Sequence, residues 1–244
     1  MTLRVSRFDA LAVPRTWYRR YPVTAFLVGL VLTIASFPFD EQFRDGDLVE
    51  AARLTVVLLA GLFALSDRRK TLVWGIVLVT PAVVGKWVNH FRPELVPDWL
   101  FLAPALLFCV FIVLHLLSFI LHAPRVDSEV LCAGVAGYLM LGLLWSVAYV
   151  LTARLAPDSF AFTVGPAGSQ SMKGFTALYY SFITLTTVGY GDVVPMKSAA
   201  RMLAMMEAMT GTFYVALLIS RLVAVYSSAQ PPPPAENPRI PGQT

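Results

Sequence analysis

The sequence predicts an all-α membrane protein, and composition gives the first reason. Of its 244 residues, 57% are hydrophobic and only 14% are charged, whereas an average soluble domain is about 25% charged. The charged residues form short clusters between long apolar runs. This alternation is expected if each apolar run crosses lipid as a helix, because a helix satisfies its own backbone hydrogen bonds there.

Six apolar runs are predicted to be transmembrane helices, since each approaches or exceeds the length that crosses a hydrocarbon core of ~30 Å. They cover residues 22–39, 48–65, 71–90, 99–121, 130–155 and 198–226. Basic residues precede the first run, acidic residues follow it, and a basic loop follows the second. This distribution places the N-terminus in the cytoplasm.

The remaining ionisable side chains show no pattern of an enzyme. The cysteines, Cys109 and Cys132, lie inside apolar runs, and the histidines at 90, 115 and 122 have no metal-ligand spacing. No nucleophile lies beside a base in the predicted helices. We therefore expect neither catalysis nor a cofactor. The net charge of +4 is concentrated at the ends of the apolar runs, where membrane lipids are a simpler partner than nucleic acid.

The most unusual stretch is a glycine-containing loop before the last apolar run. Residues 174–185 are too short to cross a membrane, so they predict a re-entrant helix. The sequence Thr-Thr-Val-Gly-Tyr-Gly-Asp follows at 186–192. Gly189 and Gly191 can adopt positive φ values, which would aim successive carbonyl groups in one direction. Irregular backbone at membrane depth survives where it is buried in protein or lines a watery path, and a row of carbonyl oxygens can replace the water around a cation.

This stretch resembles the pore region of the potassium channel superfamily, and residues 130–226 resemble its outer helix, pore helix, filter and inner helix. The resemblance implies K⁺ sites formed by carbonyl oxygens of the Thr-Val-Gly-Tyr-Gly filter. The expected K⁺ ligands are Thr187, Val188, Gly189 and Tyr190, and Gly191 completes the filter. A ring of such loops needs four copies, so the resemblance implies a homotetramer with three further copies of this chain.

The resemblance also assigns supporting positions around the filter. Asp192 is expected just behind the outer mouth, and Thr184 and Thr186 support the filter from the end of the pore helix. Tyr179 and Tyr180 occupy the places where relatives usually have bracing tryptophans, and Ile183 replaces a carboxylic acid found in some relatives. These departures leave the stability of the filter open.

Two residues of the last apolar run are further candidates. Gly211 matches the hinge glycine of the family's inner helices, although close packing against a neighbouring helix explains a mid-helix glycine equally well. Glu207 is an intramembrane acid, and such acids are rare and usually partnered. We expect Glu207 to accept hydrogen bonds from Ser181 or Thr184, as a structural brace or as a proton-sensitive site.

The fourth apolar run argues against a voltage sensor. Residues 99–121 contain no Arg or Lys. One charge moved through 100 mV contributes ~2.3 kcal/mol, so a helix without fixed charge contributes almost none. The first four helices thus resemble a sensor domain in number only, and we expect weak voltage dependence.

These expectations divide the chain into five parts and place it in the cell membrane. The parts are a basic cytoplasmic N-terminus (1–21), a four-helix unit (22–121), a cytoplasmic linker (122–129), a pore domain (130–226) and a disordered Pro-rich cytoplasmic tail (227–244). Both termini are expected in the cytoplasm and the filter mouth outside. The leading hypothesis is a potassium-selective channel. A less selective cation channel, and a transporter subunit or sensory protein with a degenerate pore, remain alternatives.

Overall fold

The computed structural model describes residues 22–42, 46–64, 69–92, 94–95, 97, 99–125, 127–163 and 171–228. The predicted N-terminal segment 1–21 and all but two residues of the predicted tail lie outside the described residues. Within the described residues the chain is built from helices with two short strands. The helices are α1 (Pro22–Ser36), the 3-10 helix η3 (Phe37–Gln42), α2 (Gly46–Ala64), α3 (Arg69–Phe91), α4 (Trp99–His122), α5 (Ser128–Leu155), α6 (Gly174–Leu185) and α7 (Ser198–Ser228).

The structure contains two short strands that the predicted all-α fold did not include. Strands β1 (Phe160–Phe162) and β2 (Val193–Pro195) pair antiparallel, with Phe160 opposite Pro195 and Phe162 opposite Val193. Both strands are rich in aromatic or β-branched residues, which favour extended backbone. Strand β1 thus lies between the fifth predicted transmembrane run and the predicted re-entrant helix.

The first helix is shorter than predicted. The predicted run 22–39 divides into α1 and η3, because Pro38 lacks a backbone N–H and disfavours helical geometry in the residue before it. At 15 residues, α1 is about 22 Å long. α2 has 19 residues and carries Asp47, Glu50 and Arg53.

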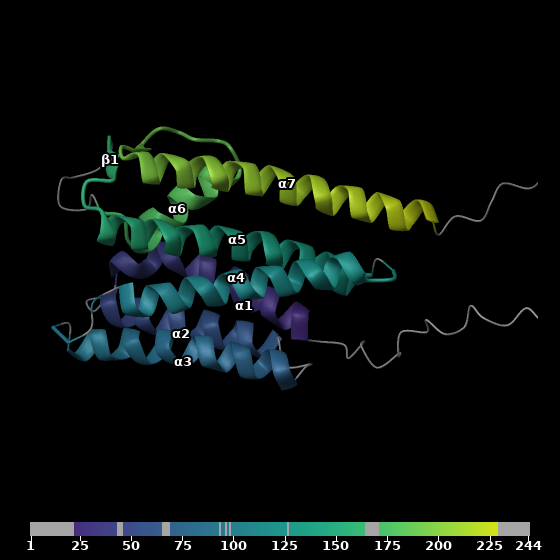
Figure 1. The fold of residues 1–244 in the computed structure, drawn as a ribbon, viewed down its shortest axis with the longest axis horizontal. Helices are drawn as coiled ribbons and strands as arrows, with labels where there is room; N and C mark the ends of the chain where they lie inside the picture. The colour runs from purple at the N-terminus through teal and green to yellow at the C-terminus, as the bar shows by residue number, and fades with distance from the viewer. Residues whose placement is uncertain are drawn as a thin grey trace, which may run out of the picture.

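Four helices of the described residues are long and apolar enough to cross a membrane, namely α3, α4, α5 and α7. The sequence-based number of six spans thus remains a prediction that adds α1 and α2 to these four. α1, α2, α3, α4, α5 and α7 run side by side along one bundle axis (Figure 1). The start of α1 and the end of α7 lie at the same end of the bundle, away from β1 (Figure 1).

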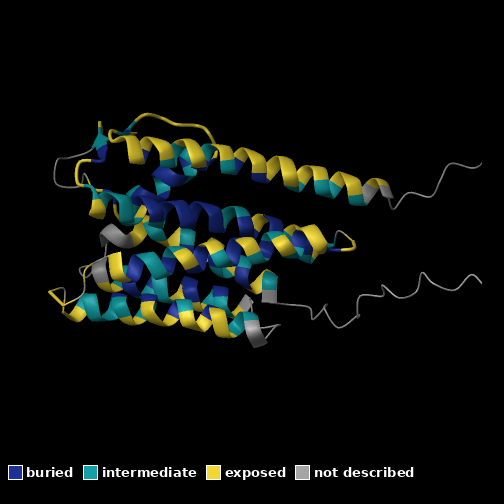
Figure 2. Ribbon diagram, in the orientation of Figure 1, coloured by how far each residue is buried: buried dark blue, intermediate teal, exposed yellow. Residues whose placement is uncertain are grey.

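Helix α5 is the centre of the structure. Its start is capped by Asp127, whose carboxylate accepts a hydrogen bond from Val130 N at 3.1 Å. It packs against α1, α4, α6 and α7. In its most apolar stretch 67% of the residues are buried, against 11% in α7, whose exposed surface is plain in Figure 2. The short helix α6 lies between α5 and α7 at the end of the bundle that carries β1 (Figure 1).

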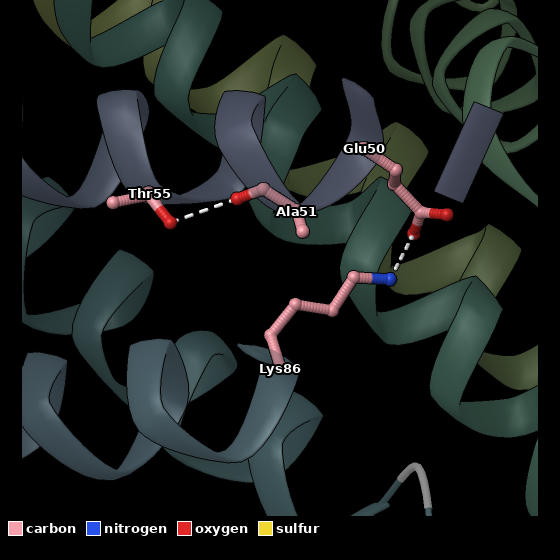
Figure 3. A network of polar contacts seen from close by, with 4 residues as sticks. All are labelled: Glu50, Ala51, Thr55 and Lys86. Carbon is pink, nitrogen blue, oxygen red and sulfur yellow. Dashed lines mark hydrogen bonds and ion pairs between the residues drawn. The ribbon is translucent and has the colours of Figure 1, made fainter. Parts of the chain in front are cut away.

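The four-helix unit, α1–α4, contains an ion pair between α2 and α3. Lys86 Nζ lies 3.2 Å from Glu50 Oε1 (Figure 3). One turn below Glu50 on α2, the Thr55 hydroxyl donates to the Ala51 carbonyl and accepts from Trp87 Nε1 at 3.1 Å. The Arg53 guanidinium stands 3.8 Å above the centre of the Phe37 ring. An ion pair and a hydrogen bond therefore connect α2 to α3, and a cation–ring contact connects it to η3.

Candidate functional site

Helix α6 has the bounds that the sequence predicts, residues 174–185. Its 12 residues span only about 18 Å, so it cannot cross a membrane alone. One face is buried and includes Ala177, Leu178 and Ile183. The helix ends at Thr186, and the loop that begins there is the candidate site.

The loop has a regular alternation of backbone handedness. The φ angles of Thr187, Gly189 and Gly191 are 60°, 53° and 80°, while the intervening Val188 and Tyr190 have negative φ. The two glycines were predicted to adopt this conformation, but Thr187 was not. A left-handed conformation costs a β-branched residue on the order of 1–2 kcal/mol, so no local signal in the sequence points to it.

Hydrogen bonds attach the loop to the end of α6. Val188 N and Gly189 N donate to the carbonyl of Ile183 at 2.9 and 3.1 Å, and Thr187 N donates to the carbonyl of Thr184 at 2.9 Å. The Thr186 hydroxyl bonds back to the Phe182 carbonyl at 2.7 Å within the same helix. The position of the loop is thus set by the position of α6.

The loop itself is exposed on the single chain. Tyr190 is 72% exposed and Val188 is 52% exposed. A Cβ atom added at Gly189 or Gly191 would meet nothing within 4 Å, so positive φ is the reason for glycine at both positions. Among the described residues no group of three or more His, Cys, Asp or Glu is arranged to hold a metal ion. The backbone oxygens of Thr187 to Tyr190, which the sequence predicts as ion ligands, lie in this loop.

The end of the loop is held by the two strands. Thr163, directly after β1, donates from its N–H to the Asp192 carbonyl at 2.9 Å, and its hydroxyl lies 3.2 Å from the Gly191 carbonyl oxygen. The Asp192 carboxylate accepts from Val193 N at 3.0 Å and is hydrogen-bonded to the Tyr179 hydroxyl. Sequence reasoning missed Thr163, because only the pairing of β1 with β2 brings it to the loop.

The two tyrosines of α6 have different neighbours. Tyr179 reaches Asp192 at the end of the loop. Tyr180 is buried, with its ring 4.8 Å from that of Tyr149 on α5 and 5.6 Å from that of Phe160 on β1, and its hydroxyl bonds to that of Thr184. Both contact the surroundings of the loop, and their predicted bracing role stays a prediction.

Glu207 of α7 lies fully buried behind α6. Its carboxyl group is bonded to the Ser181 hydroxyl of α6 at 2.5 Å and to the Tyr149 hydroxyl of α5. The predicted contact with Ser181 is confirmed, whereas Thr184 bonds to Tyr180. Tyr149 was missed, because no spacing in the sequence relates it to Glu207, 58 residues away.

Gly211 marks the crossing of α7 over the end of α6. A Cβ atom at this position would lie 2.3 Å from the Leu185 carbonyl oxygen, and α7 continues without a break through it. This contact favours the close-packing interpretation. The hinge role stays a prediction.

The inner end of α7 is tied to α5 and to the predicted linker. The Tyr214 hydroxyl donates to the Gly134 carbonyl at 2.8 Å. Arg221 Nη2 donates to the carbonyl of Ala123, between α4 and α5, at 2.7 Å. The second half of α7 is therefore held by α5 and by the segment between α4 and α5.

The part of the chain that contains this loop is similar in sequence to known proteins. Residues 130–228, which contain α5, the strands, α6, the loop and α7, match the family model described as "Ion channel". The chain is 34% identical over 88 residues to two pore potassium channel b of Oryza sativa subsp. japonica, covering 36% of this chain and 24% of the relative. Residues 130–228 are therefore similar to an ion channel family and to potassium channels. No solved structure matches the chain significantly.

Two further proteins that are similar to this chain come from a plant and from a mammal. Two-pore potassium channel 1 of Arabidopsis thaliana is 51% identical over 55 residues, covering 22% of this chain and 15% of the relative. The A-type voltage-gated potassium channel KCND3 of Homo sapiens is 25% identical over 96 residues, covering 39% of this chain and 14% of the relative. The chain thus spans less than a quarter of these relatives' length. The similarity to ion channels and the four long apolar helices of the described residues together indicate a multi-pass membrane protein.

Proposed function

We propose that this chain is one subunit of a homotetrameric, potassium-selective channel that conducts K⁺ passively across the cell membrane. The observation that carries the proposal is the alternation of left-handed residues at Thr187, Gly189 and Gly191 in an exposed loop of a potassium channel unit. Such alternation can direct successive carbonyl oxygens toward one axis, where three further copies supply the rest of the coordination shell. K⁺ is the permeant ion, bound at Thr187 to Tyr190.

The proposed topology has six spans, with both termini in the cytoplasm and the filter mouth outside. It is supported by the charge distribution and by the common end of the bundle at which α1 starts and α7 ends (Figure 1). Helix α4 carries no Arg or Lys, so the proposed channel is not strongly voltage-gated.

The decisive experiment is flux through the purified protein in lipid vesicles. K⁺ and Na⁺ reversal potentials are measured for the natural chain, for Gly189→Ala and for Gly29→Ala. Gly189 has a φ of 53°, so alanine strains the filter, whereas a Cβ at Gly29 of α1 meets nothing within 4 Å. We expect K⁺ selectivity in the natural chain and in Gly29→Ala, and its loss in Gly189→Ala.

The same measurement separates the alternatives. Equal K⁺ and Na⁺ permeability in the natural chain would support a less selective cation channel, which the tyrosines at 179 and 180 would help to explain. Absence of any flux from a folded, reconstituted protein would support a transporter subunit or a sensory protein. Unaltered selectivity in Gly189→Ala would contradict the assignment of the filter.

A further inference from the structure

The hydrogen bonds around Glu207 determine how many protons this buried cluster must hold. Three short oxygen–oxygen contacts form a chain: the Tyr149 hydroxyl to Glu207 Oε2, Glu207 Oε1 to Ser181 Oγ at 2.5 Å, and Ser181 Oγ to the Gly142 carbonyl oxygen at 2.7 Å. Each contact needs one proton between its two oxygens. The Tyr149 and Ser181 hydroxyls supply one proton each, and the Gly142 carbonyl supplies none. The third proton must come from the carboxyl group of Glu207.

An ionised Glu207 would leave one of these contacts without a proton. Ser181 could then donate either to Glu207 or to the Gly142 carbonyl, and the other pair of oxygens would face each other with lone pairs only. Such a buried, unsatisfied contact is unfavourable, and the cluster could relieve it by moving α6 away from α5 or α7.

The surroundings of Glu207 favour the neutral acid for a second reason. The side chain is 0% exposed within the single chain, so neighbouring subunits cannot add a direct partner. The titratable groups that face it are Tyr138 and Tyr149 on α5 and Tyr180 on α6, and all are phenols. Among the described residues, the side chains hydrogen-bonded to Glu207 are the hydroxyl groups of Ser181 and Tyr149, neither of which is a cation. A buried carboxylate with no cation is costly, whereas a protonated carboxyl group that donates and accepts hydrogen bonds is not.

We infer that Glu207 is a neutral, protonated positioning residue that fixes the pore helix α6 between α5 and α7, and that its deprotonation at alkaline pH weakens K⁺ conduction. The link to conduction follows from the attachment of the filter. Val188 and Gly189 are bonded to the Ile183 carbonyl, one half-turn beyond Ser181, so a displaced α6 displaces the filter. The part that concerns conduction rests on the proposed function, and the part that concerns protonation does not.

The protonation is tested by infrared difference spectroscopy of the reconstituted natural chain against Glu207→Gln. The natural chain should show a protonated-carboxyl C=O band at neutral pH that Glu207→Gln lacks and that disappears as the pH is raised. Absence of that band at neutral pH overturns the inference, whatever the flux measurements give. If the band is present and titrates but the protein conducts no K⁺ at any pH, the protonation stands and the proposed function fails.

The link to conduction is tested by the pH profile of K⁺ flux in the same vesicles. Glutamine can donate to Ser181 and accept from Tyr149, so Glu207→Gln should conduct within about twofold of the natural chain at neutral pH. The natural chain should lose about tenfold in flux where its carboxyl band disappears, and Glu207→Gln should not. An identical alkaline loss in both proteins overturns the link. A Glu207→Gln protein that folds as a tetramer but does not conduct at neutral pH overturns it as well.

Discussion

Glu50 and Glu207 show two opposite ways to accommodate a glutamate in an apolar helix. Glu50 of α2 faces the cation of Lys86 on α3, and 40% of its side chain is exposed (Figure 3). Glu207 of α7 is fully buried and bonds to two hydroxyl groups. The first arrangement keeps both charges, whereas the second is complete only with a neutral acid. The charge state of a glutamate in an apolar helix therefore depends on the groups that it contacts, which the residue type alone does not reveal.

The same contrast extends to the two units that contain these glutamates. In residues 130–228, α5 packs against four other helices, and 67% of its most apolar stretch is buried. In the four-helix unit, only 22% of the most apolar stretch of α3 is buried. Burial is therefore greatest in α5, and substitutions at its buried positions should be tolerated less well than substitutions on the exposed surface of α3.

The largest effect should come from Gly211→Ala compared with Gly29→Ala. The new Cβ at position 211 would overlap the Leu185 carbonyl oxygen at 2.3 Å, whereas position 29 is open. We expect a loss of about 1–3 kcal/mol or more of unfolding free energy for Gly211→Ala. Gly29→Ala should be neutral or stabilising by up to about 1 kcal/mol. Denaturation of the detergent-solubilised protein measures both, and equal stabilities would contradict the close contact between Gly211 and Leu185.

The second comparison applies one substitution to both glutamates. Glu50→Gln leaves the largely buried Lys86 ammonium without its carboxylate, whose loss should cost about 1–3 kcal/mol. Glu207→Gln replaces a neutral acid with a neutral amide of similar shape, which can keep both hydrogen bonds, and should therefore cost less than Glu50→Gln. The same unfolding measurement at neutral pH applies. A larger loss for Glu207→Gln than for Glu50→Gln would contradict this comparison.

A smaller effect is expected at the outer end of the filter. Thr163→Val removes a hydroxyl that lies 3.2 Å from the Gly191 carbonyl oxygen and 3.1 Å from that of Asp192, but it keeps the backbone N–H bond to Asp192. We therefore expect a loss of about 0.5–1.5 kcal/mol in the stability of the proposed filter. In flux measurements this should appear as a several-fold reduction in the K⁺ to Na⁺ permeability ratio. Thr80→Val is the matched control, because the Thr80 hydroxyl bonds within its own helix to the Ile76 carbonyl. Equal ratios in the two variants would exclude a role of Thr163 in selectivity.

The smallest effect should be that of membrane potential. A moving charge contributes ~2.3 kcal/mol per 100 mV, and α4 offers no Arg or Lys to move. Conductance measured over a range of voltages should therefore change with a shallow slope. A steep slope, equivalent to several charges, would mean that the four-helix unit senses voltage by groups other than those of α4.

Features that depend on residues close together in the sequence were predicted from the sequence. The short apolar run before the glycine-containing loop predicted the observed bounds of α6. The positive φ of Gly189 and Gly191 was predicted as well, because glycine lacks a Cβ atom. Long-range contacts were less accessible. The Thr163 bond depends on strand pairing, and the Tyr149 bond depends on how α5 and α7 pack. The φ of Thr187 opposes its intrinsic preference, so only the hydrogen bonds of the folded loop reveal it.

The exposure of Val188 and Tyr190 on the single chain has a consequence for mixtures of natural and altered subunits. Because one chain carries a single copy of the loop, a ring of four pools the loops of four polypeptides. When subunits mix at random, the share of rings without any altered loop falls as the fourth power of the natural fraction. A subunit with a damaged filter should therefore suppress its natural partners in co-expression. A damaged loop that fails to assemble should leave them unaffected.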